Sequence, residues 1–469
     1  MKRIETILKI CCLFGVLILL TGKLSVLKAK DKNKLPEKIL LLDDRIIEKL
    51  ENVKLTLGKI EKHDSNPLFV EDKVWEKRFD NLYGNVIYDS DENIYKCWYS
   101  PFIVDYSAQG MSLEERNSKD YEEPDDREMG ICYAISKDGI KWQKPNLGLV
   151  EYENSKENNI VWRGPHGAGI FKDDYESNAN RKYKTIFQGL NTSVSSNGLN
   201  WSKPTPCKGV RVAGDTHNNA FWAPTLGKYV GITRSWGEFG RQVARIESND
   251  FTNWTGEEVI LEGTDKGQQP YAMPVFYYGG IYLGLIAVYE QESDRVWTEL
   301  AWSSDTKNWN RVCPGTPLIP CSEKVLDYDY GCVYPSAYPV FLKDEIRLYY
   351  GGSDYLHFGW RNGSLCLATL RTDGFAGYEQ KSSENSGMVV TKTFPYSGQE
   401  IQITADVEKK GWIKVNILDK NGNKVCSAKR ITKTVSNRTL KIRKKIKTDE
   451  IRFQFELSKA KLYSITFTE

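Results

Sequence analysis

Two aspartates occupy matching positions in stretches that we expect to be inner strands of a repeated sheet. Asp80 lies nine residues before Asp89 and Asp215 nine residues before Pro224, where each strand is expected to turn. Because strands that turn at one end start together at the other, the two carboxylates should face a common axis. Asp329, just before another such strand, is expected in the same zone. Carboxylates gathered in this way can act as a general acid and a general base.

Further candidates fall in loops expected at the same end of these strands. Glu290 ends a strand there and is a candidate proton donor, the alternative being a solvated loop acid. The candidates for substrate binding are the arginines, histidines and aromatic residues at this end, namely Arg163, His166, His217, Trp222, Arg234, Trp236, Tyr271, His357, Trp360 and Arg361.

Each class of binding candidate also has a purely structural interpretation. Guanidinium groups hold carboxylates through paired hydrogen bonds, so Arg234, Arg241 and Arg361 would suit an acidic sugar, or else would pair with local acids. The histidines would contact substrate, or else form hydrogen bonds within the core and loops. The tryptophans would stack on a pyranose face, or else pack between sheets.

A recurring hairpin motif marks the elements that would position these residues. It first appears as Ser136-Lys-Asp-Gly-Ile-Lys-Trp142 and returns from Ser195, Ser248, Ser303 and, in degenerate form, Thr372, at intervals of 59, 53, 55 and 69 residues. In each copy a hydroxyl residue and then Asp or Asn would cap backbone N–H groups, Gly or Asn would accept positive φ, and an aromatic residue closes the turn. Recurrence at this period predicts an all-β fold, a five-bladed β-propeller.

The motif also predicts the domain organisation. Residues 1–29 are expected to be a signal peptide, residues 30–69 an N-terminal strand and capping segment, residues 70–380 the propeller, and residues 388–469 a C-terminal β-sandwich. The signal is indicated by basic residues before an apolar run that ends at Leu20, with Ala29 as a small residue suited to cleavage. That run is too short to predict a membrane span.

Composition agrees with a large secreted β protein. The 469-residue chain has 26 Tyr, 13 Trp and 17 Phe, which is typical of strands and of surfaces that stack on sugars. A net charge of +3 gives no strong field for nucleic acid. Eight of the ten cysteines follow the signal, and we favour free buried thiols over disulfides for most of them. No CxxC, histidine-rich cluster, phosphate loop or dinucleotide fingerprint occurs, so no metal and no cofactor are expected.

Several stretches resemble a known family. They are the hairpin motif with Lys144-Pro-Asn-Leu-Gly-Leu149, together with Phe79-Asp-Asn-Leu-Tyr83, Asp215-Thr-His-Asn-Asn-Ala-Phe-Trp222 and Leu348-Tyr-Tyr-Gly-Gly352. They resemble secreted bacterial proteins described as glycosyl hydrolase family 32-like and, more broadly, the five-bladed propeller glycosidases of families 32, 43, 68 and 117. The resemblance spans roughly residues 39–378. The sucrose-cleaving signature Trp-Met-Asn-Asp-Pro-Asn-Gly is absent, so hydrolysis of fructan or sucrose is not implied.

The resemblance implies roles for the carboxylates. It makes Asp80, on the first blade, the base and Asp215, on the third, the acid. The resembled enzymes usually have Glu as the acid, so Glu290 or Glu238 from a loop is the alternative.

The second-blade carboxylate of those enzymes has no clear counterpart here. Asp173 is expected at a strand turn, on the order of 20 Å from the shared end at ~3.3 Å per residue, where we interpret it as a hairpin cap. That leaves His166 or Arg163 at the corresponding place.

Together these patterns predict a secreted or periplasmic glycoside hydrolase acting on a poly- or oligosaccharide. Its carboxylates, on non-adjacent blades, would leave room for a water, which is the inverting arrangement at roughly 6.5–9.5 Å. The alternatives are a carbohydrate-binding propeller without catalysis and a glycoside phosphorylase on the same scaffold. A carbohydrate is the expected partner; nucleic acid and a membrane span in the mature chain are not expected. The sugar, its linkage and the oligomeric state stay open.

Overall fold

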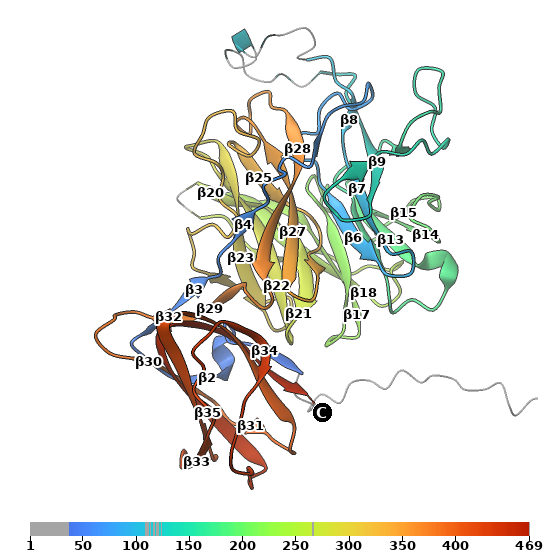
Figure 1. Ribbon diagram of the computed structural model, residues 1–469. Coiled ribbons are helices and arrows are strands. Elements are labelled where there is room, and N and C mark those ends of the chain that lie inside the picture. Colours follow the sequence, from blue (N-terminus) through green and yellow to red (C-terminus); the bar gives the residue numbers. More distant parts are fainter. Residues whose placement is uncertain are drawn as a thin grey trace, which may run out of the picture. The chain divides into compact units, whose positions relative to one another are not determined.

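The computed structural model describes residues 37–107, 124–264 and 267–468, together with residues 112, 114, 115, 118 and 122. The described residues belong to one compact unit that extends to the C-terminal end, and the predicted signal peptide lies outside the described residues. Strands dominate the described ranges, as the sequence predicts, with 3-10 helices at Asp44–Ile46 (η1) and Ala179–Arg181 (η2) (Figure 1). No helix within these ranges is long and apolar enough to span a membrane.

Antiparallel strands follow one another in groups along the chain. The first group contains β6 (Asn85–Asp89), β7 (Ile94–Tyr99), β8 (Phe102–Val104), β9 (Glu128–Ser136), β10 (Trp142–Gln143) and β11 (Ile160–Arg163). Strand β7 pairs with β6 and β9, and β9 also pairs with β8, β10 and β11. The chain therefore runs up and down through this sheet in sequence order.

The next two groups repeat this order as four-stranded sheets of the described chain. One contains β12 (Gly169–Lys172), β13 (Tyr183–Phe187), β14 (Asn191–Ser195) and β15 (Thr205–Pro206). The other contains β16 (Asn219–Ala223), β17 (Lys228–Gly237), β18 (Gly240–Ser248) and β19 (Glu258–Leu261).

Two further groups share one sheet. The first contains β20 (Gln268–Ala272), β21 (Val275–Tyr278), β22 (Ile281–Glu290), β23 (Arg295–Ser303) and β24 (Asn310–Val312). The second contains β25 (Cys332–Pro335), β26 (Val340–Phe341), β27 (Glu345–Ser353) and β28 (Gly363–Arg371). Parallel pairing of Val296 with Cys332 joins them. Strands β4 (Glu61–Lys62) and β5 (Phe69–Val70), from the start of the chain, pair with β28 and so complete the second group.

The recurring motif forms the capped turn that the sequence predicts. In the first copy, Oγ of Ser136 accepts the N–H of Gly139 at 2.8 Å, and Oδ1 of Asp138 accepts the N–H groups of Ile140 and Lys141 at 2.8 Å each. The equivalent side chains in the next three copies also accept two backbone N–H groups each: Asn197, Asp250 and Asp305.

Positive φ is not confined to Gly or Asn in these turns, which corrects the expectation. Gly139 and Gly198 have φ of +74° and +77°, but Phe251 and Thr306 occupy the same place with +60° and +67°. The ring of Phe251 is buried and packs edge-on against Trp254, with centroids 5.3 Å apart. Packing and the capping bonds together impose the left-handed conformation on these residues.

The last copy of the motif serves a different purpose. Instead of capping its own turn, the Asp373 carboxylate accepts from Nζ of Lys38 at 2.7 Å, Oγ1 of Thr404 at 2.9 Å and Oγ of Ser464 at 2.6 Å. The motif therefore ties the end of the repeat region to the strands that follow it.

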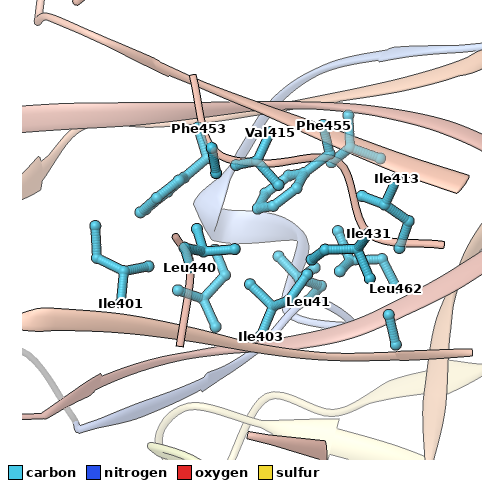
Figure 2. Packing of buried hydrophobic residues seen from close by; sticks show 14 of the residues in the cluster. Leu41, Ile401, Ile403, Ile413, Val415, Ile431, Leu440, Phe453, Phe455 and Leu462 are labelled. Atoms are coloured by element: carbon cyan, nitrogen blue, oxygen red, sulfur yellow. The ribbon is translucent and has the colours of Figure 1, made fainter. Parts of the chain in front are cut away.

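Those strands form a further sheet around β35. It contains β1 (Lys38–Leu40), β2 (Ile47–Glu51), β3 (Val53–Leu57), β29 (Ala376–Gln380), β30 (Gly387–Thr391), β31 (Phe394–Pro395), β32 (Glu400–Leu418), β33 (Lys424–Ser427), β34 (Val435–Thr439) and β35 (Glu450–Thr468). Figure 2 shows its apolar core, in which Leu41 packs with Ile403 of β32 and Phe455 of β35. Residues 38–57, which the sequence predicts as a capping segment, thus join the C-terminal strands.

All eight cysteines that follow residue 36 are described, and they are free thiols, in agreement with the interpretation that we favoured. Cys97 and Cys132 lie on the paired strands β7 and β9, where Cys97 pairs with Ala134 in register. Burial raises the pKa of Cys97 and of Cys132 well above the usual range, so both stay protonated.

Candidate active site

Asp80 lies on an irregular loop that comes before β6. The sequence predicts that Asp80 lies in an inner strand, but β6 begins only at Asn85. The backbone φ values of Asp80, Leu82 and Tyr83 are +55°, +58° and +45°. Residues with a Cβ atom rarely adopt this conformation, and it persists only where surrounding contacts impose it. The loop therefore interrupts the strand alternation at the residues nearest the candidate carboxylate.

Two arginines hold the carboxylate of Asp80. Nη2 of Arg361 donates to Oδ1 of Asp80 at 2.6 Å, and Nη1 of Arg78 lies 3.2 Å from the same oxygen. Burial alone would raise the pKa of Asp80, but the charges of Arg361 and Arg78 outweigh it and hold the pKa well below its usual range. The side chain of Asp80 is 16% exposed, so part of the charged carboxylate stays accessible.

Asp215 lies in a more open position, on the loop before β16. Its side chain is 55% exposed. Nε2 of His166 lies 3.8 Å from Oδ1, and Nη1 of Arg234 lies 3.6 Å from Oδ2. The loop is fixed by Asn218, whose amide donates to the carbonyls of Gly167 at 3.0 Å and Gly214 at 2.8 Å. A fixed backbone thus presents a solvent-accessible carboxylate.

His166 lies beside Asp215 and is close enough to Asp80 for the charge of that carboxylate to act on its imidazole. Burial lowers the pKa of its imidazole, whereas the charges of Asp215 and of Asp80 act to raise it. The ring packs against Tyr83 with centroids 5.1 Å apart, and its buried Nδ1 has no hydrogen-bond partner. The structure therefore brings together Asp80, His166 and Asp215, which we call the Asp80 site.

A buried polar network underlies the Asp80 site. The amide of Asn81 donates to the hydroxyl of Tyr83 at 2.8 Å and to that of Tyr271 at 3.2 Å, and its Oδ1 accepts from Nη2 of Arg361 at 2.8 Å. Burial and then the neighbouring Tyr271 raise the pKa of Tyr83 well above its usual range, so this phenol stays neutral. The sequence reasoning did not select Asn81 or Tyr83, because strand alternation would turn neighbours of Asp80 away from it.

The predicted histidines His217 and His357 are both buried. His217 packs against Tyr83 with centroids 5.2 Å apart, and burial lowers its pKa to about 3. Nδ1 of His357 lies 2.8 Å from the hydroxyl of Tyr334, and its ring lies edge-on to Tyr271 at 4.9 Å. Burial lowers the pKa of His357 well below its usual range, so both imidazoles are neutral.

Two predicted residues lie outside the Asp80 site. Asp329 is fully buried, where Nζ of Lys62 lies 2.6 Å and the hydroxyl of Tyr350 2.8 Å from Oδ2. Trp222 packs against Tyr229 with ring centroids 5.0 Å apart. The carboxylate of Asp329 thus forms a structural ion pair with Lys62. Trp222 packs against a neighbouring ring, which was its alternative interpretation.

Arg163 and Glu290 have local partners. Arg163 forms an ion pair with Glu128 across strands β11 and β9, and Nε contributes a hydrogen bond of 2.7 Å. Oε2 of Glu290 accepts the N–H of Ser293 at 2.8 Å, which caps the turn after β22. Both side chains are thus engaged by local partners, and Glu290 lies in a loop, as its alternative interpretation had it.

The remaining predicted residues surround the Asp80 site. Arg234 is buried, and its Nη2 donates to the carbonyl of Tyr271 at 2.8 Å. The ring of Trp360 lies under the guanidinium of Arg78 at 5.0 Å. Trp236 is 64% exposed at the end of β17, where its ring is available to a ligand.

A cavity of about 440 Å³ adjoins the Asp80 site. It is lined by Trp162, Gly164, Pro165, His166, Phe187, Gln188, Gly189 and Pro204. Trp162 and Phe187 meet edge-on, with centroids 5.4 Å apart, and offer an apolar surface beside His166. Within the described residues, no cluster of three or more His, Cys, Asp or Glu side chains could hold a metal ion.

Neither a family model nor a curated protein sequence matches this chain. Several solved structures are similar at low identity. An N-acetylgalactosamine deacetylase from F. plautii, in complex with blood group B trisaccharide, is 13% identical with a TM-score of 0.46, over 68% of this chain and 96% of that chain. A glycosyl hydrolase from Bacteroides ovatus is 14% identical with a TM-score of 0.47, over 66% of this chain and 94% of that chain.

A third solved structure comes from GH130, a family of mannoside phosphorylases that contains glycoside hydrolases targeting beta-1,2 mannosidic linkages in Candida mannan. It is 14% identical with a TM-score of 0.46, over 66% of this chain and 94% of that chain. Proteins described as glycoside hydrolases are thus among the solved structures that are similar to this chain.

Proposed function

We propose that this chain is a glycoside hydrolase whose reaction takes place at the Asp80 site. One observation supports this most directly: two carboxylates in opposite environments lie around one histidine. Asp80 is buried against two guanidinium groups, whereas Asp215 is 55% exposed. Hydrolysis of a glycosidic bond uses such a division, with one carboxylate that stays charged and one that exchanges a proton.

Asp80 is proposed to orient the attacking water and to stabilise the positive charge that develops on the sugar ring. Its depressed pKa keeps the carboxylate ionised near neutral pH. As the new C–O bond forms, Asp80 accepts a proton from the attacking water, and its negative charge also stabilises the transition state. Asp215, which faces solvent, is proposed to protonate the leaving oxygen, with an inverting outcome.

The proposed scaffold is a five-bladed propeller. Each of the five strand groups in the described chain provides strands at four successive positions, and the start of the chain completes the last group through β4 and β5. Such pairing of the two ends of a ring supports closure without exposed strand edges. Residues 388–469 are proposed to form a β-sandwich to which β1, β2 and β3 contribute.

Export to the periplasm or medium is also proposed, from the pattern of residues 1–29. N-terminal sequencing of the protein from its host is expected to give a start near Lys30. An intact Met1 in a cytosolic fraction would contradict it.

A carbohydrate-binding protein without catalysis is the second candidate. It is favoured by the pairing of Asp80 with Arg361 and Arg78, since a structural carboxylate would be held in the same way. The two candidates differ in whether sugar is released.

The test is a screen of the full chain against a glycan panel, followed by kinetics of Asp80→Asn and Asp215→Asn on any substrate that is cleaved. Each variant is expected to remain folded and to lose on the order of 10²–10⁴ in kcat. Asp80→Asn should also melt at a lower temperature, because it leaves Arg361 and Arg78 without the charge of their partner. Asp344→Asn, at an exposed aspartate before β27, is the matched control. Near-normal turnover by both site variants would place the reaction elsewhere, and binding without any released sugar would support the second candidate.

A further inference from the structure

Two arginines share one aromatic ring beside the Asp80 site. The guanidinium of Arg234 lies 4.2 Å and that of Arg241 4.8 Å from the ring centroid of Tyr271. Both arginines come from the hairpin of β17 and β18. Two positive charges held against the same ring repel each other unless negative charge lies close to both.

The side chains present supply little of that negative charge. Nε and Nη2 of Arg234 donate to the carbonyl of Tyr271 at 3.3 and 2.8 Å, and Nη1 lies 3.6 Å from the half-exposed Asp215. Nη1 of Arg241 donates to the amide oxygen of Gln269 at 2.8 Å. Among the described residues no carboxylate lies within 4.0 Å of Arg241, and its buried Nε has no hydrogen-bond partner.

Asp294 also acts electrostatically on Arg241, but its carboxylate is engaged elsewhere. It accepts from the hydroxyl of Tyr289 at 3.1 Å and from the N–H of Phe358 at 2.9 Å. Burial raises the pKa of Asp294, whereas these two hydrogen bonds and the charges of Arg361 and Arg241 act to lower it. The arginine pair therefore retains an excess of positive charge and a buried N–H that points to no protein acceptor.

An aromatic surface lies next to this excess charge. Trp236, opposite Arg241 in the hairpin register, is 64% exposed, and the guanidinium of Arg241 lies 5.0 Å from its ring centroid. Phe239, at the tip of the hairpin, is also exposed. An exposed indole beside a guanidinium is suited to a sugar ring that carries a negative group.

We infer that Arg234 and Arg241 form an oxyanion subsite of the Asp80 site. Its ligand is either the carboxylate of an acidic sugar, with the ring against Trp236, or free phosphate that enters as a second substrate. Both are oxyanions that a guanidinium holds through directed N–H bonds. This inference rests on the proposed function only in placing the subsite next to Asp215 of the Asp80 site. Anion binding can be measured whether or not the protein turns over a substrate.

The experiment titrates the full chain calorimetrically with D-glucuronate, inorganic phosphate and, as the neutral match, D-glucose. At least one anion is expected to bind about tenfold or more tightly than glucose, and added NaCl should weaken it. Arg241→Gln should bind that anion about tenfold more weakly than the wild type. Arg241→Lys should lose less affinity, since Lys keeps the positive charge but not the planar guanidinium with its paired N–H donors. Arg443→Gln, at an exposed arginine between β34 and β35, should bind as the wild type does.

Preference for glucuronate would identify an acidic sugar, and preference for phosphate a free co-substrate; both outcomes support the subsite. Equal affinity for glucose and both anions, or full anion affinity in a folded Arg241→Gln, would overturn it. Asp80→Asn separates the two proposals, because it should lose turnover while retaining anion affinity.

Discussion

Glu71 lies behind the loop that carries Asp80 and holds it in place. Its Oε1 accepts the N–H of Phe79 at 2.9 Å and that of Gly363 at 2.7 Å. One carboxylate thereby joins the Asp80 loop to the start of β28, two residues after Arg361. Burial raises the pKa of Glu71 to about 7, although both N–H groups act to lower it.

Glu71 should make stability depend on pH near neutrality. Its folded pKa of about 7 exceeds the ordinary value of 4.5, so between these limits the folded state binds more protons than the unfolded state. The free energy of unfolding should therefore fall as pH rises from about 5 to 8, by on the order of 1–3 kcal/mol. Glu71→Gln keeps a hydrogen-bond acceptor but cannot titrate. Its free energy of unfolding should therefore fall less than that of the wild type between pH 5 and pH 8.

Urea unfolding of wild type and Glu71→Gln at pH 5 and pH 8 measures this difference. Glu157→Gln, at an exposed position, should keep the wild-type pH dependence. Identical pH dependence in Glu71→Gln and wild type would show that Glu71 does not titrate in this range.

At the scale of elements, the repeat hairpins are held by their own side chains. In the first hairpin the backbone N–H groups of Lys141 and Ile140 lower the pKa of Asp138 to about 2. The bonds span at most three residues, so each turn is specified by a short stretch of sequence. The Asp80 loop is the opposite case, because contacts from distant residues impose its left-handed backbone.

Asp138→Ala should lower the free energy of unfolding by about 1–2 kcal/mol near pH 7, because two backbone N–H groups lose their acceptor. Because the pKa of Asp138 is lower in the folded state than its unfolded value of 3.8, its carboxylate stabilises the fold above that pH, and this stabilisation is lost as pH falls. The difference in free energy of unfolding between wild type and Asp138→Ala should therefore shrink as pH falls from about 4 towards 2. Chemical unfolding of Asp138→Ala at both ends of this range checks it. Lys137→Ala, on the same exposed turn, should differ little from wild type; a similar loss in both variants would refute the capping role.

At the scale of the whole molecule, Asp373 connects the repeat region to the C-terminal strands. Besides Lys38, Thr404 and Ser464, its carboxylate accepts from the hydroxyl of Tyr278 on β21. Strand β1, the strand group from β20 to β24 and the sheet around β35 therefore meet at the buried carboxylate of Asp373. Removal of one partner from such a group leaves the others without compensation.

Asp373→Ala should lower the free energy of unfolding by about 3 kcal/mol, since it leaves Lys38 and three hydroxyl groups without their acceptor. Differential scanning calorimetry should show a lower Tm, and a loss of cooperativity between the repeat region and the C-terminal strands would appear as two transitions. Asp344→Ala is the exposed control. A variant as stable as this control would mean that Asp373 does not join the two regions.

The sequence by itself determined the all-β character and the recurring hairpin. Both depend on contacts between residues that are close in the chain, such as Ser136 with Gly139, and the pattern of residue types records such contacts directly. The same strand order led us to expect Asp80, His166 and Asp215 at one end of the repeated sheets, and this shared site stays a prediction.

Only the tertiary structure decided what surrounds those residues. Arg361 reaches Asp80 across 281 positions of the chain, and the left-handed loop turns Asn81 towards Arg361 where strand alternation would turn it away. Asp329, placed with the site by strand counting, instead pairs with Lys62 from the N-terminal strand that completes the last group. Partner choice for a buried charge depends on which groups the closed fold brings within a few ångströms, because an unpaired charge in the interior is too costly to persist.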